Sequence, residues 1–325
     1  MDIAFFRSSS YNAWDYCEQQ YYLSYVLGIP QDVNAKAQKG TMFHKVMECL
    51  ALGKLSLQTG QPMTDDVCGT IDQNKIYDIE YVYELLDKSF EHYRKHDPES
   101  FTEKDKKEIK KWISDYFNFN NGMFDPRKRV IFAAEQNFNF EIPDDWALLP
   151  DGNRLRLKGT IDLITKLGDK FIEVIDYKTG RRLDWATGQE KDLKKLQSDP
   201  QLMIYFYALK NLYPDYHILF TIFFVRDGGP FTLHFDDSVI QKVSGMLQER
   251  YLEIKSCKLP KMVHPTHNDF RCNKLCHYYK NNYEDTSISI CDYIHRKIKT
   301  NGIDWVTKNM SASGHTVDSY KAPGE

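Results

Sequence analysis

Residues 159–182, with the sequence GTIDLITKLGDKFIEVIDYKTGRR, constrain the fold more than any other part of the chain. Two runs rich in Ile and Val flank the short segment KLGDK, a pattern that predicts an antiparallel β-hairpin. Asp162 and Asp176 lie fourteen residues apart across this turn, so both carboxylates can project near each other on one face of the sheet. Lys178 shares the strand parity of Asp176 and points to the same side.

This placement of two carboxylates has a chemical consequence. Like charges that lie close together repel and raise each other's pKa unless a cation lies between them. A hard divalent ion such as Mg²⁺ or Mn²⁺, which prefers oxygen ligands, removes the repulsion. An ammonium group beside the ion can orient a water and stabilise charge on a phosphate oxygen. The three residues therefore provide the groups needed for metal-assisted phosphodiester hydrolysis. The alternative is a surface hairpin with ordinary salt bridges.

The N-terminal third of the chain has the pattern of helices. Serines suited to N-capping begin a helix over 8–28, which ends at a Gly-Ile-Pro sequence. Residues 35–53 repeat apolar side chains along one face, as in an amphipathic helix. Two more helices are predicted at about 78–95 and 102–119. This region is therefore expected to be mainly helical.

The middle of the chain changes to a mixed pattern. Short runs of β-forming residues alternate with Gly, Pro and Asp clusters, and a Pro that follows Asp199 opens a later helix. Strands are predicted at 130–142, 154–166, 170–178, 217–225 and 230–235, and helices at 200–214 and 237–256. The sequence therefore predicts one α/β or α+β domain with a helical N-terminal region.

Composition limits the class of protein. The 325 residues include 43 Lys and Arg against 46 Asp and Glu, a net charge of −3, so any basic surface must be local. No run of 18 apolar residues predicts a membrane span, and the N-terminus lacks the pattern of a secretory signal. Seven cysteines in such a chain indicate reduced thiols or metal ligands, and a cytoplasmic location is expected.

Four short motifs occur in a fixed order along the chain. Gly40 and His44 form G-x-x-x-H, residues 159–162 read G-T-I-D, residues 176–180 read D-Y-K-T-G, and Gln201 begins a Q-x-x-x-Y motif. This set resembles the PD-(D/E)XK nuclease superfamily, and within it the RecB/AddB-like group that includes the CRISPR-adaptation nucleases. The resemblance covers roughly residues 8–295 and implies a restriction-endonuclease-like core, with a central mixed β-sheet flanked by helices.

The resemblance implies a division of the chain into four parts. These are a helical N-terminal part with the His motif, a catalytic core, a Cys-rich segment that packs back on the first helix, and a polar tail. Their expected bounds are 1–125, 126–257, 258–306 and 307–325.

The resemblance also implies roles for single residues. Metal ligands would be His44, Asp162, Asp176 and the backbone carbonyl of Tyr177, with Lys178 as the catalytic lysine and with Gln201 and Tyr205 positioning DNA or that lysine. Glu135 lies on the strand before the hairpin, where such nucleases often have an acidic residue; a solvated edge-strand glutamate is the alternative. A lone helical histidine is usually structural, but the G-x-x-x-H spacing favours a ligand role for His44.

The cysteines suggest a second metal centre. In the RecB/AddB-like group, one N-terminal and three C-terminal cysteines commonly hold a four-iron, four-sulfur cluster, and Cys17, Cys272, Cys276 and Cys291 resemble that set. The spacing departs from the family, because fourteen residues separate Cys276 from Cys291. Zinc, with His267 or His277 nearby, is an alternative, as are buried thiols without a metal. Cys49, Cys68 and Cys257 are interpreted as structural.

The expected function follows from these motifs. The sequence predicts a metal-dependent DNA nuclease, by resemblance an exonuclease on single-stranded or end-containing DNA in recombination, repair or replication. Arg181 and Arg182 follow the catalytic strand and are candidates to hold phosphates. The sequence has no Walker A motif, so a helicase partner would be a separate chain. A phage source, with action in the host cytoplasm, is compatible. The alternatives are a non-catalytic DNA-binding or assembly subunit and an RNA-directed nuclease.

Overall fold

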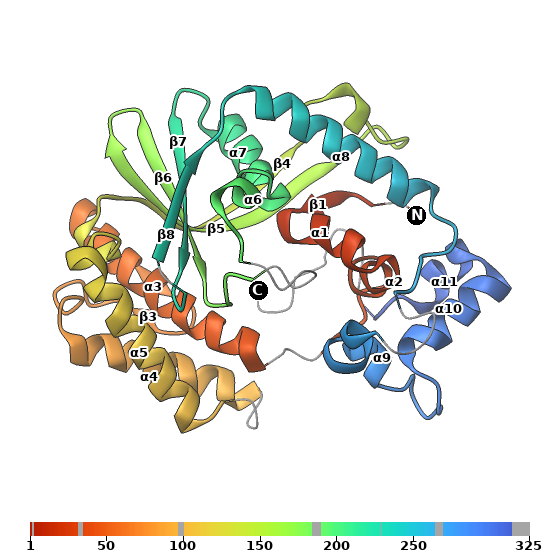
Figure 1. Cartoon of the computed structure of the whole chain (residues 1–325), viewed down its shortest axis with the longest axis horizontal. Coiled ribbons are helices and arrows are strands. Elements are labelled where there is room, and N and C mark those ends of the chain that lie inside the picture. Colours follow the sequence, from red (N-terminus) through yellow and green to blue (C-terminus); the bar gives the residue numbers. More distant parts are fainter. Residues whose placement is uncertain are drawn as a thin grey trace.

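A six-stranded mixed β-sheet forms the centre of the computed structural model (Figure 1). The structure describes residues 1, 3–31, 35–96, 101–183, 190–227, 229–263 and 269–313. The strands of this sheet are β1 (Phe5–Arg7), β4 (Ile131–Glu141), β5 (Arg156–Gly168), β6 (Phe171–Lys178), β7 (His217–Phe224) and β8 (Gly229–His234). Neighbours follow the order β1-β5-β6-β7-β8, and β4 pairs with β5. The predicted strands are confirmed, whereas β1 is too short to give a sequence signal.

Strand β5 is the branching point of the sheet. β4 runs antiparallel along one edge of β5, from Arg156 to Thr165. On the other edge, β1 pairs in parallel with residues 156–158, and β6 pairs antiparallel with β5 from Leu163 onward. Residues 159–162, the G-T-I-D motif, lie between these two pairings. The sheet therefore opens on this edge at the motif, and β6 continues to β7 in parallel.

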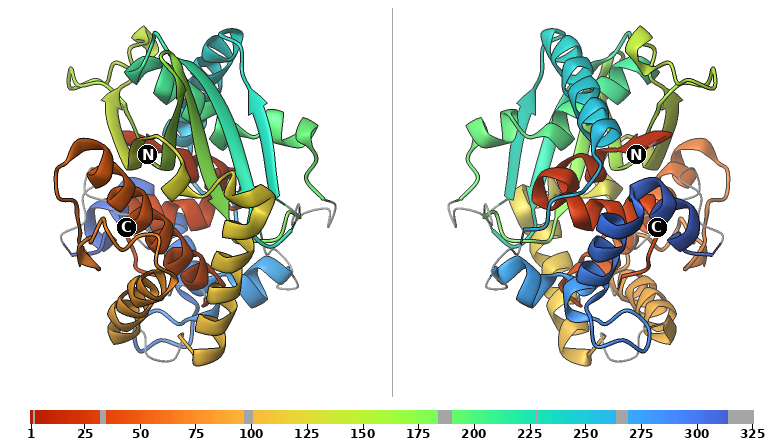
Figure 2. Two further views of the ribbon diagram at one scale, coloured as in Figure 1. Left: turned by 90° about the vertical axis from the view of Figure 1, so that its left-hand side faces the viewer. Right: turned by 90° about the vertical axis from the view of Figure 1, so that its right-hand side faces the viewer.

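Helices cover both faces of the sheet (Figures 1 and 2). On one face, α3 (Ala35–Thr59), α4 (Ile79–His96) and α5 (Glu103–Asn118) enclose an apolar cluster that includes Phe43 and Tyr177. On the other face, α7 (Pro200–Leu212) and α8 (Ser238–Ser256) enclose a larger cluster with Val174 and Phe220. The predicted helices in these regions are confirmed. The fold is a mixed α/β arrangement with a central mixed sheet flanked by helices, as predicted.

The predicted helix over 8–28 is wrong as a single element. It divides into α1 (Ser8–Tyr16), α2 (Glu18–Tyr21) and a π-helical turn over Tyr22–Val26. Cys17 has extended backbone angles, φ −168° and ψ 111°, and its sulfur accepts a hydrogen bond from the backbone N–H of Gln20. A cysteine in the N-cap role is not one of the usual start signals, so the break was not predictable from pattern.

The C-terminal helices pack against α2 and the π-helical turn that follows it (Figures 1 and 2). The Tyr22 hydroxyl donates to the carbonyl of Ile303, and the hydroxyls of Ser24 and Tyr278 lie 3.0 Å apart. The elements of this region are a π-helical turn over Arg271–Leu275, α9 (His277–Lys280), α10 (Ile290–Asn301) and α11 (Ile303–Met310). The first residues of the predicted tail at 307–325 thus belong to α11, and residues 314–325 lie outside the described residues.

Short elements complete the fold. β2 (Thr64–Asp65) and β3 (Gly69–Thr70) form a small hairpin between α3 and α4. The short helix α6 (Leu193–Gln197) precedes α7, and 3-10 turns occur at Phe119–Gly122, Pro126–Lys128 and Asp145–Ala147. None of the described helices is long and apolar enough to cross a membrane.

Candidate active site

Asp162 and Asp176 face each other at the point where β5 and β6 begin to separate. The register pairs Leu163 with Ile175 and Ile164 with Val174, so the two aspartates occupy the next opposing positions. The strand pairing ends before them, and Asp162 Oδ2 instead accepts a hydrogen bond from the backbone N–H of Tyr177 at 2.8 Å. The hairpin therefore brings together the two carboxyl groups that the sequence pattern placed on one face.

Lys178 contacts Asp176 directly. Its Nζ lies 2.9 Å from Oδ1 and 2.8 Å from Oδ2 of Asp176. Burial raises the pKa of Asp176, the Lys178 charge opposes this rise, and the charge of Asp162 adds to it. Burial alone would lower the pKa of Lys178, but the neighbouring carboxylates outweigh it and raise the pKa. Lys178 is therefore a cation at neutral pH, and its side chain keeps 38% exposure for contact with a substrate.

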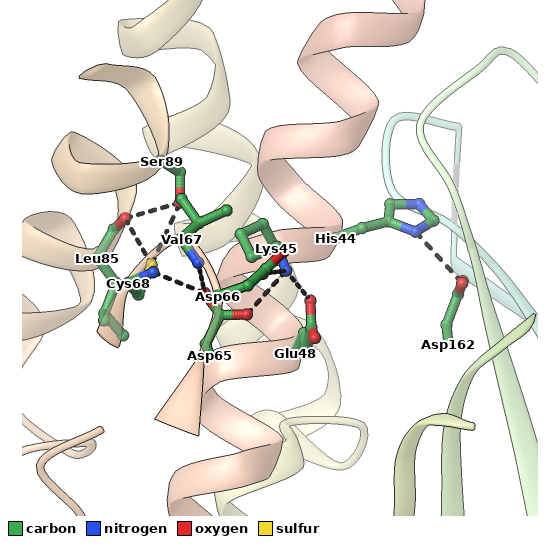
Figure 3. Close-up of polar contacts among 10 residues, drawn as sticks. All are labelled: His44, Lys45, Glu48, Asp65, Asp66, Val67, Cys68, Leu85, Ser89 and Asp162. Atoms are coloured by element: carbon green, nitrogen blue, oxygen red, sulfur yellow. Dashed lines mark hydrogen bonds and ion pairs between the residues drawn. The ribbon is translucent and has the colours of Figure 1, made fainter. Parts of the chain in front are cut away.

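His44 lies on α3, and its imidazole points toward Asp162 (Figure 3). Its Nδ1 lies 3.4 Å from Asp162 Oδ1. Burial disfavours the imidazolium, but the charges of Asp162, Asp176 and Glu135 outweigh burial and raise the pKa of His44 to about 8. Burial likewise opposes ionisation of Asp162, yet the charge of His44 and their hydrogen bond hold the pKa of Asp162 below its usual value. The two side chains therefore form an ion pair when His44 is protonated, and both would be available to hold a metal ion when it is not.

Two neighbours fix the position of His44. A Cβ atom on Gly40, one turn earlier on α3, would lie 2.7 Å from Thr179 Oγ1, so the glycine lets α3 approach the end of β6 closely. The ring of Tyr177 meets the imidazole edge-on, with ring centroids 5.7 Å apart. The glycine in G-x-x-x-H and the tyrosine in D-Y-K-T-G therefore both place the histidine against Asp162.

Glu135 lies opposite Asp162 on β4, because the ladder pairs Ala134 with Leu163 and Gln136 with Ile161. Its φ of 43° is left-handed, a rare conformation for a residue with a side chain. Burial and the charges of Asp162 and Glu48 raise the pKa of Glu135 to about 8.

The donor atoms around Asp162 fit a divalent cation. His44, Glu135 and Asp162 each offer one ligand atom, and these atoms lie within 4.8 Å of one another. Asp176 lies across the hairpin from Asp162 but is not one of these three residues. Carboxylate oxygens with a single imidazole nitrogen are suitable ligands for Mg²⁺ or Mn²⁺. These side chains could therefore hold one such ion between α3 and the open edge of β5.

Gln201 and Tyr205 approach from the other face of the sheet, on α7. Gln201 Nε2 donates a hydrogen bond to the Tyr205 hydroxyl at 3.1 Å. The Tyr205 hydroxyl lies close enough to Lys178 that its ionised form would raise the pKa of the lysine. A hydrogen bond also links the Tyr205 hydroxyl to Ser8, the first residue of α1. The structure thus places the Q-x-x-x-Y pair beside Lys178 and fixes it to the N-terminal helix.

A cavity of about 910 Å³ extends from this group of residues between α3, the β2–β3 hairpin and β5. Sequence reasoning missed Arg7 and Glu48, which line it with His44 and Glu135. Glu48 follows His44 by four residues on α3, so helical spacing alone could have indicated it. Arg7 gives no comparable signal, because only the pairing of β1 with β5 brings it to the cavity.

A family model for the PD-(D/E)XK nuclease superfamily matches residues 8–278. The chain belongs to the PD-(D/E)XK nuclease superfamily. No curated protein matches it. Among solved structures, a candidate exonuclease from Eubacterium rectale is similar at 15% sequence identity and a TM-score of 0.46, over 89% of this chain and 92% of that chain.

Membership of this superfamily makes the chain a hydrolytic nuclease and implies a nucleic-acid substrate. Superfamily members usually use divalent metal ions, which agrees with the ligand atoms around Asp162. The sequence-based prediction of the superfamily is therefore confirmed.

The four cysteines predicted to bind a second metal centre are well separated along the chain from the hairpin. Cys272, Cys276 and Cys291 are buried, and Cys17 is half-buried. Burial raises the pKa of the Cys272 thiol to about 12, and the nearby charges of Cys276 and Cys17 add to this rise. Burial also raises the pKa of the Cys291 thiol, and the charges of the other three cysteines contribute. The fold therefore brings the four cysteines close enough to interact. Of the two histidines considered with them, His277 lies next to Cys276, and His267 is outside the described residues.

The remaining cysteines have structural surroundings. Cys49 and Cys68 lie within 4.8 Å of the carboxylate of Asp65, and all three are buried. Asp65 already accepts hydrogen bonds from Lys45 and from the backbone N–H groups of Val67 and Cys68 (Figure 3). The Cys68 thiol donates to the carbonyl of Leu85. These contacts join α3, the β2–β3 hairpin and α4; Cys257 lies half-buried at the end of α8.

The two arginines after β6 differ in their surroundings. Arg182 forms an ion pair with Glu190, and its guanidinium lies over the ring of Phe231. Arg181 is exposed and lines a small pocket that also contains Lys178. Arg181 is therefore the better placed of the two to contact a substrate phosphate.

Proposed function

We propose that the chain is a divalent-metal-dependent DNA nuclease of the RecB/AddB-like type. The observation that supports this most is the arrangement of two opposed aspartates, one paired with Lys178 and the other with His44. His44, Asp162, Asp176 and the backbone carbonyl of Tyr177 would hold Mg²⁺ or Mn²⁺, with Glu135 as a further ligand. The ion would supply an activated water and neutralise charge at the scissile phosphate.

The protein side chains would complete the reaction as follows. Asp162 and Asp176 stay ionised as ligands, and Lys178 donates hydrogen bonds to the attacking water or to a non-bridging phosphate oxygen. Gln201 and Tyr205 restrict the position of Lys178 from the α7 side. Because positioning and charge neutralisation supply most of the catalysis, no separate general base is required.

We further propose that the substrate is single-stranded or end-containing DNA and that cutting is exonucleolytic. A cavity of about 910 Å³ has the size of sites that enclose drug-sized molecules, which corresponds to a few nucleotides rather than a duplex. The walls formed by α3 and the β2–β3 hairpin support entry of one strand.

The proposed function is tested by degradation of end-labelled single- and double-stranded DNA, and of RNA of the same sequence, with Mg²⁺, Mn²⁺ or EDTA. Metal-dependent cutting by the wild type should fall at least about a hundredfold in Lys178→Ala. Lys166→Ala, an exposed lysine on the same hairpin, should cut normally. DNA binding without cutting would instead favour the non-catalytic subunit, and preferential RNA cleavage would favour the RNA-directed alternative.

We also propose that Cys17, Cys272, Cys276 and Cys291 bind a four-iron, four-sulfur cluster. Zinc–sulfur bonds of about 2.3 Å in a tetrahedral site separate ligand sulfurs by only about 3.8 Å. Among the described residues, the groups of three ligand atoms within 4.8 Å include none of these four thiols. Such a spacing does not suit a single zinc ion, and the one-plus-three pattern of cysteines, which resembles that of the RecB/AddB-like group, supports the cluster.

A further inference from the structure

A second, smaller pocket adjoins Lys178. Its volume is about 200 Å³, and it shares no lining residue with the large cavity around His44 and Asp162. It lies between α6, α7 and the ends of β6 and β7, and Lys178 forms part of its wall. A substrate strand that crosses the proposed metal site from the large cavity would therefore meet this pocket beside the catalytic lysine.

The inner wall of the pocket is apolar. Its apolar lining residues are Leu183, Leu196, Leu202, Ile222 and Phe224. Four of these are buried in the sheet–α7 interface, and Leu183 is half-buried at the rim. Such a wall suits a flat, largely apolar group, because aromatic and aliphatic surfaces stack on base faces without regard to sequence. The volume corresponds to roughly seven water molecules, which is enough space for one nucleobase.

The rim of the pocket is cationic. Lys178, Arg181 and Lys191 all line it. Lys191 is partly neutralised by Asp199, at 3.6 Å, whereas Arg181 is exposed to solvent. An apolar interior beneath a cationic rim favours a ligand with an apolar ring attached to phosphates over an apolar peptide side chain.

Polar groups at one side of the pocket can contact a base edge. Gln201 uses one amide hydrogen to bind the Tyr205 hydroxyl, and its amide carbonyl is not part of that bond. Asp199 Oδ1 caps the first turn of α7 by accepting from the backbone N–H of Gln201. A glutamine amide held in this way can hydrogen-bond an extruded base.

We propose that this pocket binds the nucleobase of the nucleotide next to the cleaved bond. This inference rests on the proposed nuclease function and adds a recognition site to it. Leu183 and Phe224 would contact the base, Arg181 would hold an adjoining phosphate, and Gln201 would contact the base edge. Binding a base here turns it out of the stack, so a single strand or a frayed end is the preferred substrate.

The test uses single-stranded oligonucleotides with one abasic residue placed at each position in turn. The wild type should cut about tenfold more slowly when the abasic residue occupies one fixed position relative to the cleaved bond. Leu183→Trp fills the rim and should cut the unmodified strand at that slow rate. On the strand with the abasic residue at that position, the variant and the wild type should cut at the same rate. A misfolded variant would cut both strands more slowly than the wild type, so this result separates a filled pocket from misfolding. Leu193→Trp, exposed on α6 and outside the pocket, is the matched control and should retain the abasic penalty.

If the wild type cuts every abasic strand at the same rate, the inference is overturned and the nuclease function stands. The same conclusion follows if Leu183→Trp still cuts the abasic strand more slowly than the unmodified strand. If the wild type cuts nothing, the proposed function fails separately. Equilibrium binding of the same oligonucleotides in EDTA then decides the question. A single abasic position that weakens binding in the wild type but not in Leu183→Trp supports the pocket, and uniform binding rejects it.

Discussion

Two motif glycines owe their positions to close contacts. A Cβ on Gly40 would come within 2.7 Å of Thr179 Oγ1, and a Cβ on Gly159 within 2.4 Å of Phe138 Cζ. Real Cβ atoms do not tolerate such distances, so each glycine allows a neighbouring element to approach. Gly40 brings α3 onto the turn after β6, and Gly159 lets the ring of Phe138, its partner on β4, pack over β5. Both glycines therefore act through the packing of neighbouring elements.

Replacing Gly40 by Ala should push α3 away from Thr179 and move His44 from Asp162. We expect about a tenfold loss in Mn²⁺ affinity, measured by isothermal titration calorimetry. Adding Thr179→Ala removes the clashing oxygen and should restore binding to the level of Thr179→Ala alone. Gly180→Ala, where a Cβ meets nothing within 4 Å, is the control. An unchanged Mn²⁺ affinity in Gly40→Ala would mean that the Thr179 side chain rotates away from the new Cβ without moving α3.

Site residues on the hairpin were predictable, and those from distant elements were not. Asp162, Asp176 and Lys178 follow from strand parity within one hairpin, which depends only on local sequence. Arg7 enters the cavity through a three-residue strand with no detectable pattern. The left-handed backbone of Glu135 is likewise invisible in a sequence of β-forming residues.

At the scale of elements, the β2–β3 hairpin is attached to α3 by a buried ion pair. Lys45 Nζ lies 2.8 Å from Asp65 Oδ2 and 3.1 Å from Asp66 Oδ1 (Figure 3). The Asp65 side chain is 1% exposed, whereas that of Asp66 is 85% exposed. The two carboxylates therefore contact the same lysine in very different environments, and only the buried contact should contribute much to stability.

Asp65→Asn should lower the free energy of unfolding at pH 7 by about 2 kcal/mol, because a buried charged hydrogen bond is lost. Asp66→Asn should cost less than about 0.5 kcal/mol. Urea unfolding of the two variants measures both values. Equal losses in the two variants would show that Lys45 gains nothing from the buried partner.

The same pair predicts a pH dependence. Burial raises the pKa of Asp65, but Lys45 and two backbone N–H groups outweigh it and lower the pKa below its ordinary value. A lowered folded-state pKa stabilises the protein above the unfolded-state pKa, and this stabilisation is lost as pH falls through the folded-state pKa. The stability difference between wild type and Asp65→Asn should therefore shrink from pH 6 to pH 2. A constant difference in urea unfolding across that range would contradict it.

The elements also show where pattern reasoning fails. Helices α4 and α5 were predicted within a few residues, because their apolar faces and flanking breaks are strong. The first helix was predicted as one element because its residues all suit a helix, yet the chain turns at Cys17. Tertiary contacts override local propensity here, because the Cys17 thiol and the backbone N–H of Gln19 both donate to the carbonyl of Lys261.

At the scale of the whole molecule, the proposed iron–sulfur cluster would join the first helices to the last through the four cysteines. Protein purified without oxygen should contain iron and absorb visible light, as iron–sulfur proteins do. Cys291→Ser should lose the iron and melt at a lower temperature, because the link between α10 and the N-terminal helices is broken. Cys257→Ser, outside the set, should keep both properties. Stoichiometric zinc in place of iron would establish the alternative, and neither metal would reject the site.

The class of the fold was predictable from the sequence, but the strand pairings and the helix contacts were not. Strand and helix patterns predicted an α/β or α+β domain, because periodicity reports burial, and the family resemblance implied the mixed sheet flanked by helices. The pairing of β1 with β5 and the packing of α10 on α2 depend on contacts between residues more than 150 positions apart, for which a single sequence gives no signal.

Ser24 and Tyr278, whose hydroxyls are in contact, lie 254 residues apart in the sequence. The ribosome therefore synthesises Tyr278 long after Ser24. At about 5 to 20 residues per second, a ribosome takes between about 13 and 50 seconds to translate that interval. Throughout this time the nascent first helices lack the surface that later covers Tyr22 and Leu23, both fully buried in the finished fold. Early chaperone capture and slow expression at low temperature should therefore raise the yield of folded enzyme.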